Sequence, residues 1–169
     1  DLECGIMKCL LGSRIYNKLI RNGGLLVENG HIIKLSVWCP RWTENTTPEE
    51  RDLINFNIER LVAFPYLTTC ILWSTNVYGN ICHLNSLLYL KAVFFGFTDI
   101  FGDVSHLWSL QQLKQCDLSS TEVTGDIKSL AALPNITQID LHHTEVTGSE
   151  RLFDLFRDEH GLNSCNVLF

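Results

Sequence analysis

The sequence predicts a solenoid, a fold in which turns of one repeated unit stack on each other, and two observations support this prediction. The run Thr-Glu-Val-Thr-Gly at 121–125 returns letter for letter at 144–148, an offset of 23 residues. A fixed period of this length is typical of repeat architectures. Glycines keep the same offset over four turns, at Gly79, Gly102, Gly125 and Gly148. The stretch 115–148 therefore sets the register for the rest of the chain.

Each predicted turn contains a short strand, because apolar and polar residues alternate there. Residues two apart on a strand point to the same side, so Cys116 and Leu118 are predicted to face inward and Asp117 and Ser119 outward. One turn cannot bury its apolar side alone, so successive turns must stack and pair their strands in parallel. The equivalent inward sets are Leu67, Cys70, Leu72; Leu90, Val93, Phe95; and Ile136, Ile139, Leu141.

This spacing resembles the leucine-rich repeat, most closely its plant-type, extracellular class. The resemblance covers roughly residues 31–155. It implies an α/β fold, a right-handed β–α superhelix with a short parallel sheet on its concave face and helical caps. It also implies protein recognition through that face. The residues that carry the resemblance are Leu110, Leu113, Cys116, Leu118, Thr121, Val123, Gly125 and Ile127.

Threonine stands where the family usually has asparagine. An asparagine side chain there satisfies backbone groups at the point where the strand bends away, and a hydroxyl can do part of this with fewer bonding groups. The threonines are Thr75, Thr98, Thr121 and Thr144.

The ends of the chain predict helical caps on a single domain. Apolar residues at helical spacing over 3–21, stopped by Asn22-Gly23-Gly24, predict an N-terminal cap over 1–30. A partner-binding or membrane-surface helix is the alternative. A C-terminal cap is predicted over 149–169, with a helix capped by Ser149 and stopped by Gly161. Its covering residues are predicted to be Leu152, Phe153, Leu155 and Phe156, so both ends are expected to be closed, as in a complete small protein.

About five repeats are expected over 31–148, with one interruption. Alternation over 31–38 predicts the first strand, with Ile32, Leu35 and Val37 inside. From Val37 to Leu72 the interval is 35 residues, 12 more than the repeat, which predicts an insertion near 38–53. Such insertions lie in surface loops, either tolerated ones or loops at a binding face.

Charge and composition limit the classes of partner that this chain is expected to bind. A net charge of −6 with 13 Lys and Arg argues against nucleic acid and anionic membranes. No apolar run reaches the roughly 18 residues of a transmembrane helix. Asn45 and Asn135 begin glycosylation sequons, which favour a secretory or lumenal location slightly and leave the compartment open.

Seven cysteines cannot all pair within one chain. Cys70 and Cys116 share the inward repeat position and are expected to be core residues. The remaining candidates for disulfides are Cys4, Cys9, Cys39, Cys82 and Cys165.

Outward positions, stacked turn by turn, give the candidate binding site. One column reads Ser36, Ile71, Phe94, Asp117, Asp140, and the next reads Trp38, Trp73, Gly96, Ser119, His142. Phe97 follows at a strand end, so the first half of the face is aromatic. The second half is acidic, with Asp99, Glu122 and Glu145 beside the two column aspartates. The predicted partner-binding residues are Trp38, Ile71, Trp73, Phe94, Phe97, Asp117, Asp140 and His142.

Two alternatives apply to these surfaces. The insertion, or Trp42 within it, could fold over the aromatic half and form a second small core. Asp140 and His142, near Asp117, resemble part of a divalent-metal site, but no third His or Cys completes a shell, so no metal and no cofactor are expected.

The sequence thus predicts a non-catalytic module that binds a protein or peptide. A constitutive accessory subunit of a larger assembly is the alternative, and a metal-dependent or carbohydrate-handling enzyme is a weak third. Motifs of nucleophilic, phosphate-binding and zinc-peptidase sites are missing from the sequence.

Overall fold

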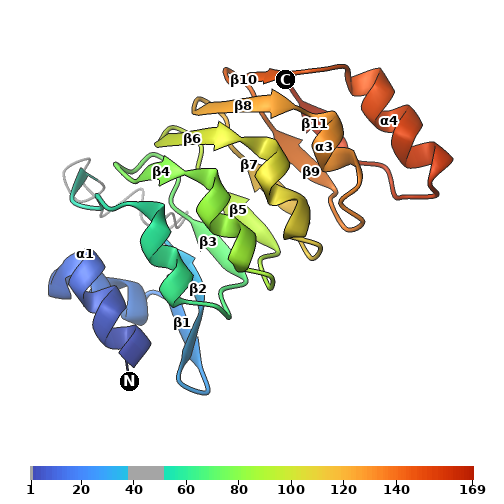
Figure 1. The fold of residues 1–169 in the computed structure, drawn as a ribbon. Helices are drawn as coiled ribbons and strands as arrows, with labels where there is room; N and C mark the ends of the chain where they lie inside the picture. Colours follow the sequence, from blue (N-terminus) through green and yellow to red (C-terminus); the bar gives the residue numbers. More distant parts are fainter. Residues whose placement is uncertain (1, 38–51) are drawn as a thin grey trace.

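The structure is a computed structural model that describes residues 2–37 and 52–169 (Figure 1). Short strands and helices alternate along the chain and stack as successive turns. One sheet has seven strands in the order β1-β2-β3-β5-β7-β9-β11, parallel throughout except for the β1–β2 pair. Its strands are β1 (Leu25–Glu28), β2 (His31–Ser36), β3 (Thr69–Ile71), β5 (Ala92–Phe94), β7 (Gln115–Asp117), β9 (Gln138–Asp140) and β11 (Asn166–Leu168).

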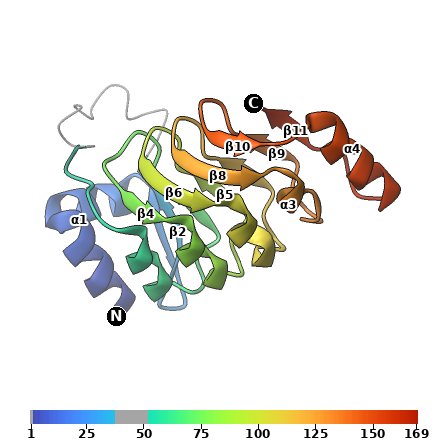
Figure 2. The same cartoon turned by 45° about the horizontal axis from the view of Figure 1, so that its top comes forward.

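A second, four-stranded parallel sheet, which the sequence pattern did not predict, lies on another side of the same turns (Figure 2). Its strands are β4 (Tyr78–Asn80), β6 (Asp99–Asp103), β8 (Glu122–Asp126) and β10 (Glu145–Thr147). In three successive turns a 3₁₀ helix connects the sheets, and in the next a short α-helix does. These are η2 (Ile58–Ala63), η3 (Ile81–Ser86), η4 (Val104–Ser109) and α3 (Lys128–Ala131).

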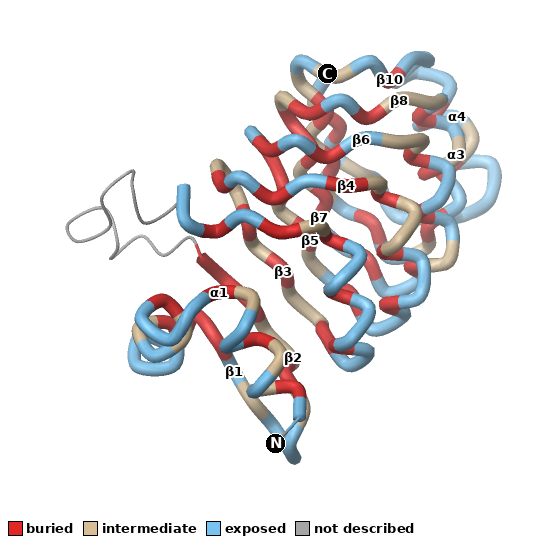
Figure 3. Tube along the Cα trace, turned by 60° about the vertical axis from the view of Figure 1, so that its left-hand side comes forward, coloured by how far each residue is buried: buried red, intermediate tan, exposed pale blue. Residues whose placement is uncertain are grey.

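The 23-residue register is confirmed in the large sheet. The strand pairing places Cys70 beside Val93, Val93 beside Cys116, and Cys116 beside Ile139, and all four are buried. Figure 3 shows buried stretches recurring in successive turns. Burial raises the pKa of the Cys116 thiol to about 12 and raises that of Cys70 as well. Both thiols therefore stay neutral and act as small core residues, as predicted.

A corner follows each of the strands β3, β5, β7 and β9. Ser74, Phe97, Ser120 and His143 occupy these corners, with φ between 51° and 57°. A buried or half-buried threonine follows in every case. The Thr98 hydroxyl donates to the Phe95 carbonyl at 2.5 Å, and the Thr121 hydroxyl donates to the Leu118 carbonyl at 2.6 Å. Thr75 and Thr144 make the equivalent bonds, so the predicted role of the threonines is confirmed.

Each glycine of the repeat contacts the Asn or Asp side chain that starts the connecting helix of the turn before. Asp103 accepts a hydrogen bond from the Ser105 amide at 2.7 Å, and hydrogen bonds from Ser105 lower the pKa of this carboxyl. A Cβ on Gly125 would lie only 2.9 Å from Cγ of Asp103. The same arrangement joins Gly102 to Asn80. Glycine is required here because both the positive φ and the close contact exclude a side chain.

The N-terminal cap is helix α1 (Leu2–Arg21), interrupted at Gly12, where φ is 74°. Glu3 ties it to the sheet, since one carboxylate oxygen accepts the Ile32 amide at 2.7 Å and the other contacts His31 Nδ1 at 2.8 Å. The sequence did not reveal β1, which turns back at Asn29-Gly30 to pair antiparallel with β2. In the described part of the chain Cys9, Cys82 and Cys165 are free thiols.

Helix α4 (Glu150–Glu159) forms the C-terminal cap, and two details of its prediction were wrong. Phe153 is buried, but Leu152 and Leu155 are exposed. Ser149 makes no side-chain capping bond. Gly161 follows the helix with φ 64°, as a helix stop does.

The last turn is covered by Arg157 and not by the exposed Leu152 and Leu155. Only 1% of Arg157 is exposed, and its guanidinium donates to the carbonyls of Ala131 (3.0 Å), Leu133 (2.8 Å) and Ile136 (3.2 Å). A buried cation thus satisfies backbone groups that the last turn leaves open. The sequence pattern could not show this, because arginine is usually expected at the surface.

Most of the predicted insertion, together with Trp38, Cys39, Trp42 and Asn45, lies outside the described residues. Ile54 and Phe56 are buried and join the same core as the later turns. Over residues 2–37 and 52–169, no helix combines the length and the apolar character needed to cross a bilayer.

Candidate binding surface

The outward column of the large sheet is built as the offset predicts. Strand pairing places Ser36, Ile71, Phe94, Asp117 and Asp140 side by side, and Leu168 of β11 extends the row. Ser36 is buried, whereas Ile71, Phe94 and the two aspartates are half-buried. The described column therefore changes from apolar to acidic between β5 and β7.

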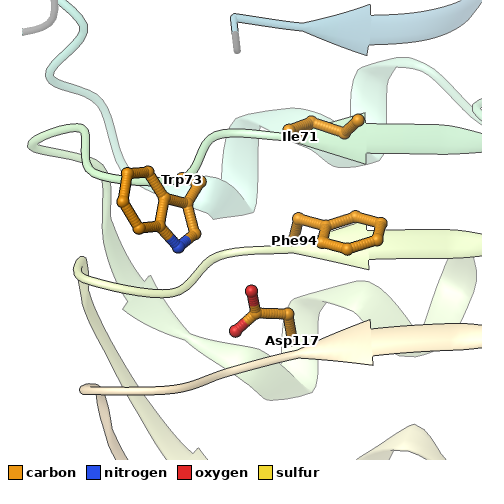
Figure 4. Close-up of a pocket in the computed structure, with 4 residues that line it drawn as sticks. All are labelled: Ile71, Trp73, Phe94 and Asp117. Atoms are coloured by element: carbon orange, nitrogen blue, oxygen red, sulfur yellow. The ribbon is translucent and has the colours of Figure 1, made fainter. Parts of the chain in front are cut away.

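A pocket of about 270 Å³ opens at this change. Its lining comes from three neighbouring strands and the corner after one of them: Ile71, Trp73, Phe94 and Asp117. Figure 4 shows the three apolar side chains on one side and the Asp117 carboxylate on the other. All four belong to the predicted site, and the structure brings them together at one point.

Phe97 lies beside this pocket, against its wall residue Trp73. Its ring packs edge-on against Trp73, with centroids 5.1 Å apart and an interplanar angle of 67°. It is 54% exposed, and its backbone has φ 57°. Ser74, Ser120 and His143 have the same left-handed backbone in the other turns, so this conformation belongs to the repeat, and only the exposed ring is particular to Phe97.

Gly96 determines the shape of the pocket, and its role was missed from the sequence. A Cβ placed on it would lie 2.8 Å from Asp117 Oδ1 and 2.9 Å from Trp73 Cδ1. The indole and the carboxylate thus contact the same spot on the backbone. A glycine at an outward strand position, where each other turn has a larger residue, was the signal that could have revealed it.

Both aspartates of the column are held in the same way. Asp117 Oδ1 accepts from the Ser119 amide at 3.0 Å and from the Ser119 hydroxyl at 2.7 Å. Asp140 Oδ1 accepts from the His142 amide at 3.1 Å and lies 3.0 Å from His142 Nδ1. The carboxylates are therefore fixed, outward-facing acceptors on adjacent strands.

The predicted extent of the acidic half was wrong. Asp99, Glu122 and Glu145 begin β6, β8 and β10, so they belong to the four-stranded sheet and not to the pocket face. The positive-φ corner residue turns the chain before each of them, and the alternation of a strand cannot be continued across that corner.

The remaining predicted residues fall elsewhere. Trp38 and Asn45 lie outside the described residues. Asn135 is exposed, and its Nδ2 donates to the Gln111 carbonyl at 2.8 Å. In the described ranges no group of three or more His, Cys, Asp or Glu side chains is arranged to hold a metal ion, and the Asp140–His142 contact stands as a pair.

Comparisons with known proteins show the leucine-rich-repeat fold. The ectodomain of the receptor kinase SOBIR1 from Arabidopsis thaliana aligns with a TM-score of 0.67 at 14% identity, over 98% of this chain and 90% of that one. The plant peptide hormone receptor RGFR1, in complex with RGF2, aligns with a TM-score of 0.55 at 21% identity over 68% of this chain.

A third similar structure is the ectodomain of the Arabidopsis thaliana receptor kinase GASSHO1/SCHENGEN3 in complex with CASPARIAN STRIP INTEGRITY FACTOR 2. It has a TM-score of 0.51 at 22% identity over 57% of this chain. The present chain spans only 12% of the length of that protein and 18% of RGFR1. No protein-family model and no curated protein matches the sequence. Identities this low establish the fold and nothing finer.

Proposed function

We propose that this chain is a non-catalytic recognition module that binds a protein or peptide through its concave face, which is the solvent-facing side of the seven-stranded sheet. In this proposal, residues 1–169 form one domain, in which caps at 1–30 and 149–169 flank the repeats at 31–148. The main support is the pocket of Ile71, Trp73, Phe94 and Asp117, where aromatic rings remain partly open to solvent. Aromatic residues in such partly desolvated pockets are the usual anchors of protein interfaces.

Two further observations support the same proposal. RGFR1 and GASSHO1/SCHENGEN3, which share the fold, were solved in complex with RGF2 and with CASPARIAN STRIP INTEGRITY FACTOR 2. In addition, Phe97 has an exposed ring that packs against Trp73 of the pocket, whereas the corners of the turns before and after it hold Ser74 and Ser120. Exposed aromatic rings beside an apolar pocket are common anchors of protein interfaces.

The test is a selection of displayed linear peptides on the purified chain, repeated on the variant Trp73→Ala. We expect peptides that bind the wild type to lose tenfold or more in affinity for the variant, in line with the roughly 2 kcal/mol of a binding hot spot. Trp108→Ala is the matched control, because Trp108 is 67% exposed on η4, away from the pocket strands. Peptides that bind wild type and Trp73→Ala equally would exclude this pocket as the binding site.

A role as a permanent subunit of a larger assembly is the second candidate. A groove of about 530 Å³ at the N-terminal end supports it, lined by Leu2, Gly5, Ile6, Cys9, Leu10 and Arg60. Leu2 is 79% exposed, and apolar side chains in a large open groove favour a constitutive partner. Light scattering after size-exclusion chromatography separates the two candidates. A stable monomer supports transient recognition, whereas concentration-dependent self-association supports the subunit role.

A further inference from the structure

We infer that the pocket of Ile71, Trp73, Phe94 and Asp117 takes the guanidinium side chain of an arginine from the partner. This inference rests on the proposed function and specifies the chemistry of the ligand. The arginine stem and the flat guanidinium lie against the rings of Trp73 and Phe94, and the charged end pairs with the Asp117 carboxylate.

The size of the pocket points to a single side chain. Its volume of about 270 Å³ lies just below the range of roughly 300–1,000 Å³ that drug-sized ligands and cofactors fill. One long side chain fits such a space.

The lining combines the two features that a guanidinium needs. Aromatic faces attract a cation, tryptophan most strongly, and a planar guanidinium can stack on them. A carboxylate at one end of the pocket offers a charged acceptor. Figure 4 shows the Asp117 carboxylate beside Phe94, with the indole nitrogen of Trp73 directed toward it. A purely apolar ligand would cover this carboxylate without a counter-charge, which is unfavourable.

The hydrogen bonds of Asp117 leave one carboxylate oxygen available for an external cation. Ser119 occupies Oδ1 with two hydrogen bonds, and Oδ2 receives none from the residues that the structure describes. Asp140 stands on the next strand, where parallel strands are about 4.8 Å apart, so a cation at Asp117 also experiences a second negative charge. Each outward residue of β3, β5, β7 and β9 lacks a positive charge: Thr69, Ile71, Ala92, Phe94, Gln115, Asp117, Gln138 and Asp140.

Gly96 allows the aromatic ring of Trp73 and the carboxylate of Asp117 to lie close together. Because it has no side chain, the Trp73 indole and the Asp117 carboxylate approach the same backbone point, with less than 3 Å from each to the position of a Cβ there. A residue with a side chain would separate the ring from the charge. The pocket is therefore shaped for a ligand group that is flat and positively charged.

The test uses three short capped peptides of one design, Gly-Ala-X-Ala-Gly, in which X is arginine, citrulline or norleucine. The probe is the ¹⁵N–¹H signal of the Trp73 indole, identified by its loss in Trp73→Ala. We expect saturable shifts with the arginine peptide and a dissociation constant on the order of 1 mM, the scale of one anchored side chain. Citrulline keeps the planar shape of arginine but carries no charge and has a carbonyl oxygen in place of one nitrogen donor, so its peptide is expected to bind roughly tenfold more weakly.

A variant pair isolates the charge. Asp117→Asn keeps an oxygen for the two Ser119 bonds and removes the charge, so the arginine peptide is expected to bind roughly three- to tenfold more weakly. Asp126→Asn is the control with the same change in net charge. It lies on the other sheet, at a helix-capping position where earlier turns have Asn57 and Asn80, and is expected to leave binding unchanged.

Several results would overturn the inference. They are equal binding of the arginine and citrulline peptides, tighter binding of the norleucine peptide, or no Trp73 shift with arginine at roughly tenfold the expected dissociation constant. Each leaves the recognition proposal standing if the display selection yields peptides that depend on Trp73. Failure of that selection as well would remove both proposals.

Discussion

Inward-facing and outward-facing residues of strands β3, β5, β7 and β9 differ in how far they vary from turn to turn. Inward, the same position holds only small or medium apolar residues, and all of them are buried: Cys70, Val93, Cys116 and Ile139. Outward, one residue further along, it holds Ile71, Phe94, Asp117 and Asp140. Inner residues must pack against the turns above and below, which limits their size and polarity. Outer residues are partly exposed to solvent, so their size and charge can differ from turn to turn. Stability should therefore depend on the inner set and recognition on the outer set.

The largest loss of stability is expected from an inner position. Leu118 is fully buried in the middle of the stack, so Leu118→Ala should lower the free energy of unfolding by about 2–5 kcal/mol through lost burial and a residual cavity. Urea denaturation followed by circular dichroism measures this. Lys114→Ala, an exposed position of the same turn, should change stability by no more than about 0.5 kcal/mol. Comparable losses in the two variants would contradict the distinction between inner and outer residues.

An intermediate loss is expected from the repeat glycine. Gly125→Ala places a methyl group against Asp103 in a backbone conformation with φ 108°, and should cost about 1–3 kcal/mol. Gly5→Ala is the control, since nothing lies within 4 Å of a Cβ there and alanine favours the helix by up to about 1 kcal/mol. Thermal unfolding of both variants should show opposite shifts. A stable Gly125→Ala protein would show that the corner can rearrange.

The smallest change in stability is expected at Phe97, which packs against Trp73 of the pocket. Phe97→Asn removes the contact with Trp73, worth about 0.5–1.5 kcal/mol, but places a residue that tolerates positive φ at the strained corner. Net stability should change by less than about 1 kcal/mol, because the two effects oppose each other. Peptides selected on the wild type should nevertheless bind poorly.

Ser120→Asn tests the corner without the ring. It changes the equivalent corner of the next turn, where no aromatic contact is lost, and should leave peptide binding intact. Isothermal titration of one selected peptide into both variants provides the comparison. If Phe97→Asn unfolds the chain to the extent that Leu118→Ala does, Phe97 belongs to the scaffold and not to the recognition surface.

The sequence predicted which residues lie side by side in the outward column of the site, but it did not predict where the site ends. Ile71, Phe94, Asp117 and Asp140 were placed correctly beside each other, because an offset of 23 residues carries any one of them to the next. Glu122 and its equivalents were placed on the wrong sheet. The error arises because side-chain alternation holds only within a strand, and the corner residue that precedes them has a left-handed backbone.

The caps show the same limit. Helical spacing located α1 and α4, and Gly161 marked the end of the second helix. The contacts that attach these helices to the repeats could not be predicted, because they are made by Glu3 and Arg157, charged residues that the pattern assigns to solvent. Each is buried because it satisfies backbone groups of a sheet or turn more than 20 residues away.

The sequence by itself determined the period, the division of each strand into inner and outer residues, and the change from apolar to acidic along the outer column. These follow from local alternation repeated at a constant offset. The tertiary structure decided that Trp73 and Asp117 meet over Gly96, that a second sheet forms, and that Arg157 closes the last turn. Those outcomes depend on how neighbouring turns approach one another, which is set by backbone angles at the corners and by contacts between distant residues.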